Sequence, residues 1–189
     1  MNTLILASSS PRRADLLRQI GILFTVIPAD IDETPLKSES PKELVLRLAR
    51  EKAEKVRFEN KGSFILAADT MVVVGRRILG KPESPEQALA FLDLLSGRRH
   101  RVYTGFCVIT PEGKMTLRHA ETKIAFKRLS VDEKDWYIST KEWEGKAGGY
   151  AIQGFAARFI SWVNGCPHNI VGLPIHDVYQ VLMGQGFFK

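Results

Sequence analysis

The chain has 189 residues, a formal charge of +6, 44% apolar residues and 25% charged residues. This is the composition of a globular protein with enough length for one substantial core or for two lobes. No apolar run approaches the ~20 residues that a membrane-spanning helix needs, and the N-terminus lacks the residue order of a signal peptide. With only two cysteines no disulfide framework is indicated, so we expect a cytoplasmic protein. The positive charge favours anionic partners, namely nucleic acid, phosphorylated small molecules or acidic surfaces.

Several segments have the serine, often followed by proline, that is typical of a helix start. In three of them a Glu or Gln stands three residues after the serine and can complete a capping box. The predicted helices begin at Ser10 with a stop at Gly21, at Ser40, at Ser84 with a stop at Gly97, and at Ser130 with an end near Thr140; Val178 to Met183 fits a C-terminal helix.

Apolar runs between these helices predict β-strands. Two of them, Val102 to Ile109 and Met115 to Phe126, flank the turn Pro111-Glu112-Gly113 and predict a hairpin. The other runs cover residues 3–7, 64–68, 71–74, 78–79 and 159–163, and we expect 71–74 to pair with 78–79 across Gly75. Because hairpins argue against an all-parallel sheet, we expect an α/β fold with a mixed central sheet and flanking helices. No internal repeat or linker is present, so residues 1–189 are interpreted as one domain.

The start of the chain combines a strand, a serine-rich turn and a helix N-terminus. The free N–H groups and the dipole of such a helix end attract anions. Arg12 and Arg13 stand in the first turn, where cations oppose the dipole unless a polyphosphate binds there. The alternative is two solvated arginines on a surface helix.

The predicted helix over residues 42–58 carries Lys52 in the middle of its apolar face. A buried ammonium group without a partner is costly, so Lys52 should meet a protein carboxylate or a substrate phosphate. The alternative is a lysine that extends past the edge of the core into solvent. The apolar residues around it are Val45, Leu48, Ala49 and Val56.

Asp69 ends the apolar run 64–68. A carboxylate at the end of a strand is typical of metal ligands and general bases, although this signal alone is weak. Asp32 or Glu33, from a predicted loop, could join Asp69 around Mg²⁺, which favours oxygen ligands and substrate phosphates. Turn capping is an alternative role for Asp32.

Two further segments offer groups to a nucleotide. Lys81 precedes Pro82 at the start of a predicted helix, where the alternative is an ordinary turn lysine. Gln153 lies in the glycine-rich run 148–154, which permits close backbone approach and offers an amide donor and acceptor to a base edge. The alternative for this run is a tight structural bend. The chain has no Walker P-loop, so phosphate binding must be assembled from separate segments.

The remaining basic and histidine residues give weaker signals. The four histidines lack zinc-ligand spacing and are interpreted as structural or surface residues. The cluster Arg98-Arg99-His100-Arg101 is the main argument for nucleic-acid binding. It is short, follows a helix stop and has no interleaved aromatic residues, so a solvated turn is favoured.

Taken together, these motifs resemble the Maf family, once named for inhibition of septum formation. The likeness covers almost the whole chain in family order. Its blocks are Ser8-x-Ser10-Pro11-Arg12-Arg13, Asp32-Glu33, Arg50-Glu51-Lys52-Ala53, Ala68-Asp69-Thr70, Leu79-Gly80-Lys81-Pro82, Leu95-Ser96-Gly97-Arg98-x-His100, the run 145–154, and Asn169-Ile170-Val171-Gly172-Leu173-Pro174.

The resemblance implies an elongated α/β structure with two lobes around a central cleft, similar to the house-cleaning inosine triphosphatases. It implies a hydrolase that uses Mg²⁺ or Mn²⁺ to cleave dTTP, UTP or base-modified pyrimidine nucleotides between the α- and β-phosphates. The alternatives are a 7-methyl-GTP-type pyrophosphatase and a non-catalytic nucleotide-binding regulator of septum formation. Neither a membrane nor nucleic acid is expected as a partner, and a homodimer is left open.

The resemblance also implies roles for single residues. Asp69 matches the family's proton acceptor, and Arg12, Thr70 and Gln153 match positions that mark the dTTP/UTP subgroup. Two departures from the family pattern, at Cys166-Pro167-His168 and Glu142-Trp143, affect loops and remove no catalytic group. The predicted catalytic residues are Asp69, Glu33, Lys52 and Lys81, the substrate-binding residues are Ser8, Arg12, Arg13, Thr70 and Gln153, and the metal ligands are Glu33 and Asp69. Which carboxylate is the base is left open.

Overall fold

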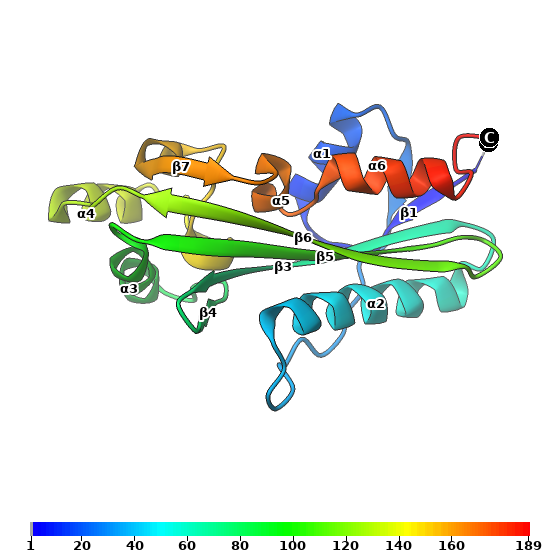
Figure 1. Cartoon of the computed structure of the whole chain (residues 1–189), viewed down its shortest axis with the longest axis horizontal. Helices are drawn as coiled ribbons and strands as arrows, with labels where there is room; N and C mark the ends of the chain where they lie inside the picture. The colour runs from blue at the N-terminus through cyan, green and yellow to red at the C-terminus, as the bar shows by residue number, and fades with distance from the viewer. Residues whose placement is uncertain (1) are drawn as a thin grey trace. The chain divides into compact units, whose positions relative to one another are not determined.

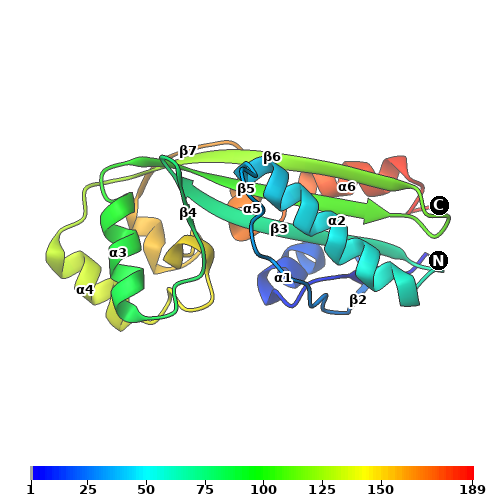
Figure 2. The ribbon, with the colours of Figure 1, turned by 90° about the horizontal axis from the view of Figure 1, so that it is seen from below.

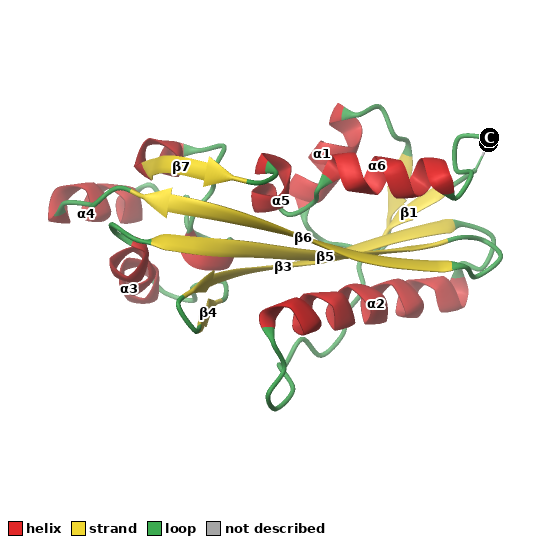
Figure 3. Cartoon of the chain, viewed as in Figure 1, coloured by secondary structure: helices red, strands yellow, loops and turns green. Residues whose placement is uncertain are grey.

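The computed structural model describes residues 2–189, and in them seven strands form one mixed sheet (Figures 1 and 3). The strand order is β2-β1-β3-β5-β6-β7, and β4 pairs with β3. The elements are β1 (Leu4–Leu6), α1 (Pro11–Gln19), β2 (Phe24–Val26), α2 (Pro41–Glu59), β3 (Phe64–Val74), β4 (Arg77–Leu79), α3 (Pro85–Leu95), β5 (Arg99–Ile109), β6 (Met115–Phe126), α4 (Val131–Ser139), the 3₁₀-helices η1 (Ala147–Gly149) and η2 (Phe155–Phe159), β7 (Ile160–Asn164), α5 (Pro167–Val171) and α6 (Ile175–Gly184).

Parallel and antiparallel pairs coexist in the sheet. β1 pairs in parallel with β2 and β3, whereas β3–β4 and β6–β7 are antiparallel. The mixed α/β fold class is therefore confirmed. Among the described residues, no helix is both long enough and apolar enough to cross a membrane.

The chain divides into two compact units. Unit 1 comprises the described residues up to Asp69 together with Thr104–Ala120 and Gly172–Lys189. Unit 2 comprises Thr70–Tyr103 and Glu121–Val171. The strands β3, β5 and β6 contribute residues to both units, so each unit is built on part of the same three strands.

In unit 1, α2 packs against one face of the sheet (Figure 2). Its small residues Ala49 and Ala53 lie in the same buried cluster as Ala67 of β3, which allows a close approach of helix and sheet. The contact is closest at Gly105 of β5, where a Cβ atom would lie 2.3 Å from the carbonyl oxygen of Val45. Only glycine fits there, so this residue sets the distance between α2 and the sheet.

In unit 2, the end of β3 turns back into β4 through Gly75, whose φ of 58° is in the left-handed region. This hairpin was predicted from the two short apolar runs around Gly75. The core of the unit lies between the sheet and α3 and α4. Its fully buried residues include Leu92, Leu95, Val102, Tyr137 and Phe159.

The predicted helix starts are largely confirmed. Ser40 and Ser130 both form reciprocal capping boxes. The box predicted at Ser84 is wrong: its hydroxyl accepts from the N–H of Gln87, but the Gln87 side chain accepts from the N–H of Glu83. The side-chain oxygen of Gln87 therefore caps the N–H of Glu83 and not that of Ser84.

Two strand predictions are wrong in their boundaries. Residues 64–74 form a single strand, so Asp69 lies inside β3 and not at the end of a strand. A polar side chain does not interrupt a backbone hydrogen-bond ladder, and the break that Asp69 suggested is absent. Arg99 begins β5 and does not belong to a solvated turn. The short elements β2 and α5 were not predicted, because elements of three and five residues carry too little periodicity.

His100 of β5 is buried in unit 2, in agreement with a structural role. Its Nε2 atom lies 2.8 Å from the hydroxyl oxygen of Tyr150, and its ring contacts Phe126 edge-on. Burial disfavours the charged imidazolium and lowers the pKa of His100 to about 4. The unfolded chain therefore takes up a proton on this residue at a higher pH than the folded chain does.

We expect His100→Gln, which cannot titrate, to weaken the dependence of stability on pH. A histidine with a depressed folded-state pKa supports the fold above its unfolded pKa of ~6.5 and loses that contribution as the pH falls towards 4. Between pH 7 and 5 the free energy of unfolding should fall by up to about 2 kcal/mol more in the parent than in the variant. Urea unfolding at both pH values measures this difference. An equal change in the free energy of unfolding between pH 7 and 5 in the two proteins would contradict the prediction.

Candidate active site

The site in unit 1 is built on one face of β3. Side chains alternate along a strand, so Ile65, Ala67 and Asp69 lie on the same face. Ile65 and Ala67 pack in the core cluster that includes Ala53 of α2. Asp69 is next on that face, and its side chain is only 9% exposed. The strand thus directs a buried carboxylate towards α2.

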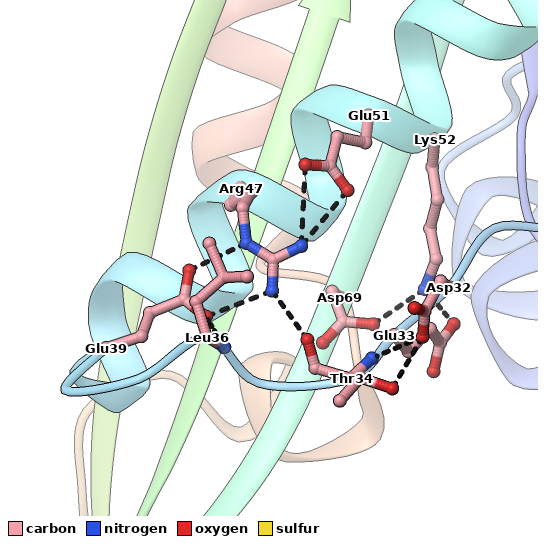
Figure 4. Close-up of polar contacts among 9 residues, drawn as sticks. All are labelled: Asp32, Glu33, Thr34, Leu36, Glu39, Arg47, Glu51, Lys52 and Asp69. Atoms are coloured by element: carbon pink, nitrogen blue, oxygen red, sulfur yellow. Dashed lines mark hydrogen bonds and ion pairs between the residues drawn. The ribbon is translucent and has the colours of Figure 1, made fainter.

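Lys52 of α2 meets this carboxylate. Its Nζ atom lies 2.7 Å from Oδ1 of Asp69 and 2.6 Å from Oε1 of Glu33 (Figure 4). The side chains of Lys52 and Asp69 are both almost buried, whereas that of Glu33 is 54% exposed. Of the two partners expected for Lys52, the structure therefore supplies protein carboxylates. An ammonium bound by two carboxylates compensates the desolvation of all three groups.

Residues 30–39, which we call the Glu33 loop, bring the second carboxylate to Lys52. Within this loop, Oδ1 of Asp32 accepts hydrogen bonds from the hydroxyl of Thr34 at 2.6 Å and from its N–H at 2.9 Å. These bonds, the hydroxyl's first, lower the pKa of Asp32. Asp32 therefore stabilises the turn, and Glu33 is the loop residue that joins Asp69.

The arginines of α1 differ in their surroundings. Nε of Arg13 donates to the carbonyl oxygen of Gly172 at 2.8 Å, and its Nη1 donates to the buried hydroxyl of Ser8 at 3.0 Å. Burial lowers the pKa of Arg13, while the charges of Asp69 and Glu33 raise it. Arg13 thus lies in the electric field of the two carboxylates and stays cationic.

Arg12, by contrast, has no hydrogen-bond partner for its guanidinium among residues 2–189. The residue is half-buried, and burial lowers its pKa. A partly desolvated guanidinium without a partner favours an external anion. The two arginines that the sequence did not distinguish therefore have different roles: Arg13 is engaged with the protein, and Arg12 is available.

The other predicted residues, Thr70, Lys81 and Gln153, belong to unit 2. Thr70 follows Asp69 in β3, and Lys81 and Gln153 are exposed. The segments of the last two are linked, because the N–H of Gly148 donates to the carbonyl oxygen of Gly80 at 2.9 Å.

Glu142 was not predicted and fixes the backbone directly after Gln153. Its carboxylate accepts hydrogen bonds from the N–H groups of Phe155 at 2.7 Å and Ala156 at 3.1 Å. A Cβ atom on Gly154 would lie 1.7 Å from Oε1 of Glu142. This glycine therefore makes room for the carboxylate, and the departure from the family pattern at Glu142-Trp143 leaves that glutamate in a structural role.

The residues of unit 1 fit a divalent cation. Glu33 and Asp69 each place an oxygen within 2.7 Å of the same cationic atom, Nζ of Lys52, so the two carboxylates converge. No group of three or more metal-ligating side chains occurs among the described residues. Magnesium needs no such cage, because it is typically bound by one or two carboxylates, substrate phosphates and water.

Comparison with known proteins identifies the family to which this chain belongs. The family model described as "Maf-like protein" matches residues 3–185. The chain is 53% identical to the dTTP/UTP pyrophosphatase of Chelativorans sp. (strain BNC1) over 97% of this chain and 91% of that protein. It is 51% identical to the dTTP/UTP pyrophosphatase of Caulobacter vibrioides over 97% of this chain and 96% of that protein. The solved Ham1 protein of Staphylococcus aureus is 16% identical, with a TM-score of 0.47, 66% of this chain covered and 72% of that chain.

We expect Lys52→Met to destabilise unit 1, because it leaves the buried carboxylate of Asp69 without its cation. The loss should be roughly 3 kcal/mol, as is typical when one partner of a buried ion pair is removed. Adding Asp69→Asn should restore much of it, because a neutral amide no longer needs the ammonium. Urea unfolding of the two single variants and the double variant forms a double-mutant cycle. Strictly additive losses would show that the two side chains are not coupled.

Proposed function

Because the chain belongs to the family of Maf-like proteins, we propose that it hydrolyses dTTP and UTP to the nucleoside monophosphate and pyrophosphate. The observation that carries this proposal is the convergence of Glu33 and Asp69 on the buried ammonium of Lys52. Two carboxylates beside several cations suit the hydrolysis of a charged anhydride. The relatives named dTTP/UTP pyrophosphatase, identical at about half of all positions, support the choice of nucleotide.

In this proposal Asp69 is the general base. Oδ1 of Asp69 accepts from Lys52, while its Oδ2 has no hydrogen-bond donor among residues 2–189 and can take a proton from the attacking water. The water oxygen forms a bond to the α-phosphorus, and the bond from that phosphorus to the oxygen bridging the α- and β-phosphates breaks. Pyrophosphate leaves with the electron pair of that bond, and the water's proton resides on Asp69.

Glu33 and Asp69 would hold Mg²⁺ or Mn²⁺, which neutralises triphosphate charge when bound. Lys52 would serve both the carboxylates and the substrate. An ammonium has three N–H donors, and within residues 2–189 two carboxylates contact that of Lys52. The third donor is available to a phosphate oxygen. Arg12, Arg13 and Ser8 from the start of α1, together with Lys81, would bind the remaining phosphate oxygens and stabilise the charge on the leaving pyrophosphate.

Recognition of the base is assigned to Gln153 and Thr70. The exposed amide of Gln153 can accept from the N3–H and donate to the O4 of thymine or uracil. Its backbone is fixed from the next residues onward by the carboxylate of Glu142. A fixed backbone limits the positions that the amide can reach, which is what discrimination between bases requires.

The proposal also covers the cellular location and the oligomeric state. Cys107 and Cys166 are both free cysteines, which supports a reducing cytoplasm as the location. A homodimer stays a prediction.

We expect pyrophosphate release from dTTP and UTP with Mg²⁺ or Mn²⁺, none after chelation by EDTA, and much slower release from 7-methyl-GTP. Asp69→Asn should lower kcat by ~10²-fold or more, because it removes the base and preserves the shape of the side chain. A panel of nucleotides scored for pyrophosphate measures both, with Arg50→Met as a control for a charge lost from the exposed side of α2. Binding of dTTP without any turnover would support a nucleotide sensor instead.

We expect Gln153→Glu to alter base preference. The carboxylate keeps the size of the side chain but presents an acceptor to O4, and a mispaired polar group typically costs ~1–3 kcal/mol. The value of kcat/KM for dTTP should fall by at least ~10-fold, and that for CTP, which has an amino group in place of O4, should fall less. The measured quantity is the ratio of the two values in parent and variant. An unchanged ratio would leave Gln153 without a part in specificity.

A further inference from the structure

The Glu33 loop is fastened to α2 by one guanidinium group. Arg47 donates from Nε to Oε1 of Glu39 at 2.7 Å and from Nη2 to Oε2 of the same carboxylate at 3.0 Å. Its Nη2 also donates to the carbonyl oxygen of Thr34 at 3.0 Å, and its Nη1 contacts Glu51 at 3.1 Å (Figure 4). The side chains of Arg47 and Glu39 are 14% and 8% exposed. This is a shielded, bidentate contact and not a surface ion pair.

Most residues of the Glu33 loop are exposed to solvent. Leu36 is 59% exposed, and Ser38 has a φ of 63°, in the left-handed region. Hydrogen bonds within the loop join Thr34 to Asp32 and Leu36 to Glu39, whose Oε2 accepts from the N–H of Leu36 at 3.0 Å. Two further residues of α2 contact the loop: Lys52 forms an ion pair with Glu33, and Lys55 donates to the carbonyl oxygen of Asp30. A loop without buried apolar side chains depends on such polar contacts for its conformation.

The carbonyl group that Arg47 binds belongs to the residue directly after Glu33. Fixing the Thr34 carbonyl oxygen fixes the backbone from which the Glu33 side chain extends. Glu33 is 54% exposed, and an ion pair of that exposure holds a loop only weakly. Arg47 adds a more shielded contact directly beside that ion pair.

We propose that Arg47 is a positioning residue of the active site, which holds Glu33 beside Asp69 so that both carboxylates are available to a divalent cation. The inference rests on the proposed function and adds to it a residue that contacts neither substrate nor metal. Arginine is needed at this position because its planar fork binds a carboxylate through two nitrogens and still reaches the Thr34 carbonyl oxygen. A lysine has a single nitrogen and cannot make these contacts together.

The first measurement concerns the loop itself. In Arg47→Lys, without nucleotide, amide hydrogen exchange over residues 31–39 should speed up by at least ~10-fold, and trypsin should cleave faster after Lys37. Arg50→Met is the matched control, since Arg50 is an exposed arginine of the same helix with no hydrogen-bond partner among the described residues. Exchange that is equal in the parent, Arg47→Lys and Arg50→Met would overturn the proposal.

The second measurement tests whether Arg47 acts through Glu33. In Arg47→Lys, the Mn²⁺ concentration for half-maximal hydrolysis of dTTP should rise by at least ~10-fold, and saturating Mn²⁺ should restore most of kcat. Mn²⁺ affinity without nucleotide, followed by electron paramagnetic resonance, should fall in parallel. In a Glu33→Gln background, Arg47→Lys should have little further effect on either quantity. A lower melting temperature with unchanged Mn²⁺ dependence, or full additivity with Glu33→Gln, would mean that Arg47 is only structural.

The outcomes separate this inference from the proposed function. A parent protein that releases no pyrophosphate refutes the proposed function, whereas loop exchange and Mn²⁺ affinity still decide the role of Arg47. If Arg47→Lys does not fold, Glu39→Gln weakens the same contact from the loop side and should produce the same changes in exchange and in Mn²⁺ dependence. If Glu39→Gln leaves both unchanged, the proposal is wrong.

Discussion

A buried ammonium group must keep anionic partners, and in this protein that requirement joins three separate segments of unit 1. Lys52 comes from α2, Asp69 from β3 and Glu33 from an exposed loop. These segments are distant in the sequence, and the buried ammonium is stable in the core only with anionic partners such as these two carboxylates. The contact that stabilises the fold therefore also assembles the two carboxylates on which the proposed chemistry depends.

The strand β3 carries Asp69 at the boundary between the two units. The first segment of unit 1 ends at Asp69 and the first segment of unit 2 begins at Thr70, so a proposed catalytic residue and a proposed specificity residue are neighbours in one continuous strand. Because side chains alternate, the two project from opposite faces of β3. Asp69 faces α2 with Ala67, and Gly105 on the adjacent strand lets that helix approach closely enough for Lys52 to reach it.

The sequence predicted what depends on local periodicity and missed what depends on tertiary contact. The position of Lys52 within an apolar stripe was enough to predict a buried cation with an anionic partner. The place of Asp69 inside a strand was not predicted. A single polar residue in an apolar run indicates the end of a strand when the neighbouring strands are unknown. Arg47 lies off the apolar stripe, so the periodicity assigns it no partner. Its contacts with the Glu33 loop depend on the tertiary structure. Glu142 was likewise hidden, because its partners are backbone N–H groups 13 and 14 positions later.

The charged groups of the site in unit 1 leave an excess of positive charge, which suits a polyphosphate. Three cations, Arg12, Arg13 and Lys52, accompany two carboxylates, and Arg13 and Lys52 are engaged with the protein. The excess charge therefore rests on Arg12, in the first turn of α1, where the helix dipole disfavours a cation. Replacing Arg12 by a neutral residue would relieve the unfavourable interaction with the helix dipole in the free protein. The same replacement would remove a cation that attracts the anionic ligand in the proposed complex. A bound anion would compensate this unfavourable charge, which supports the proposed binding of a polyphosphate beside Arg12.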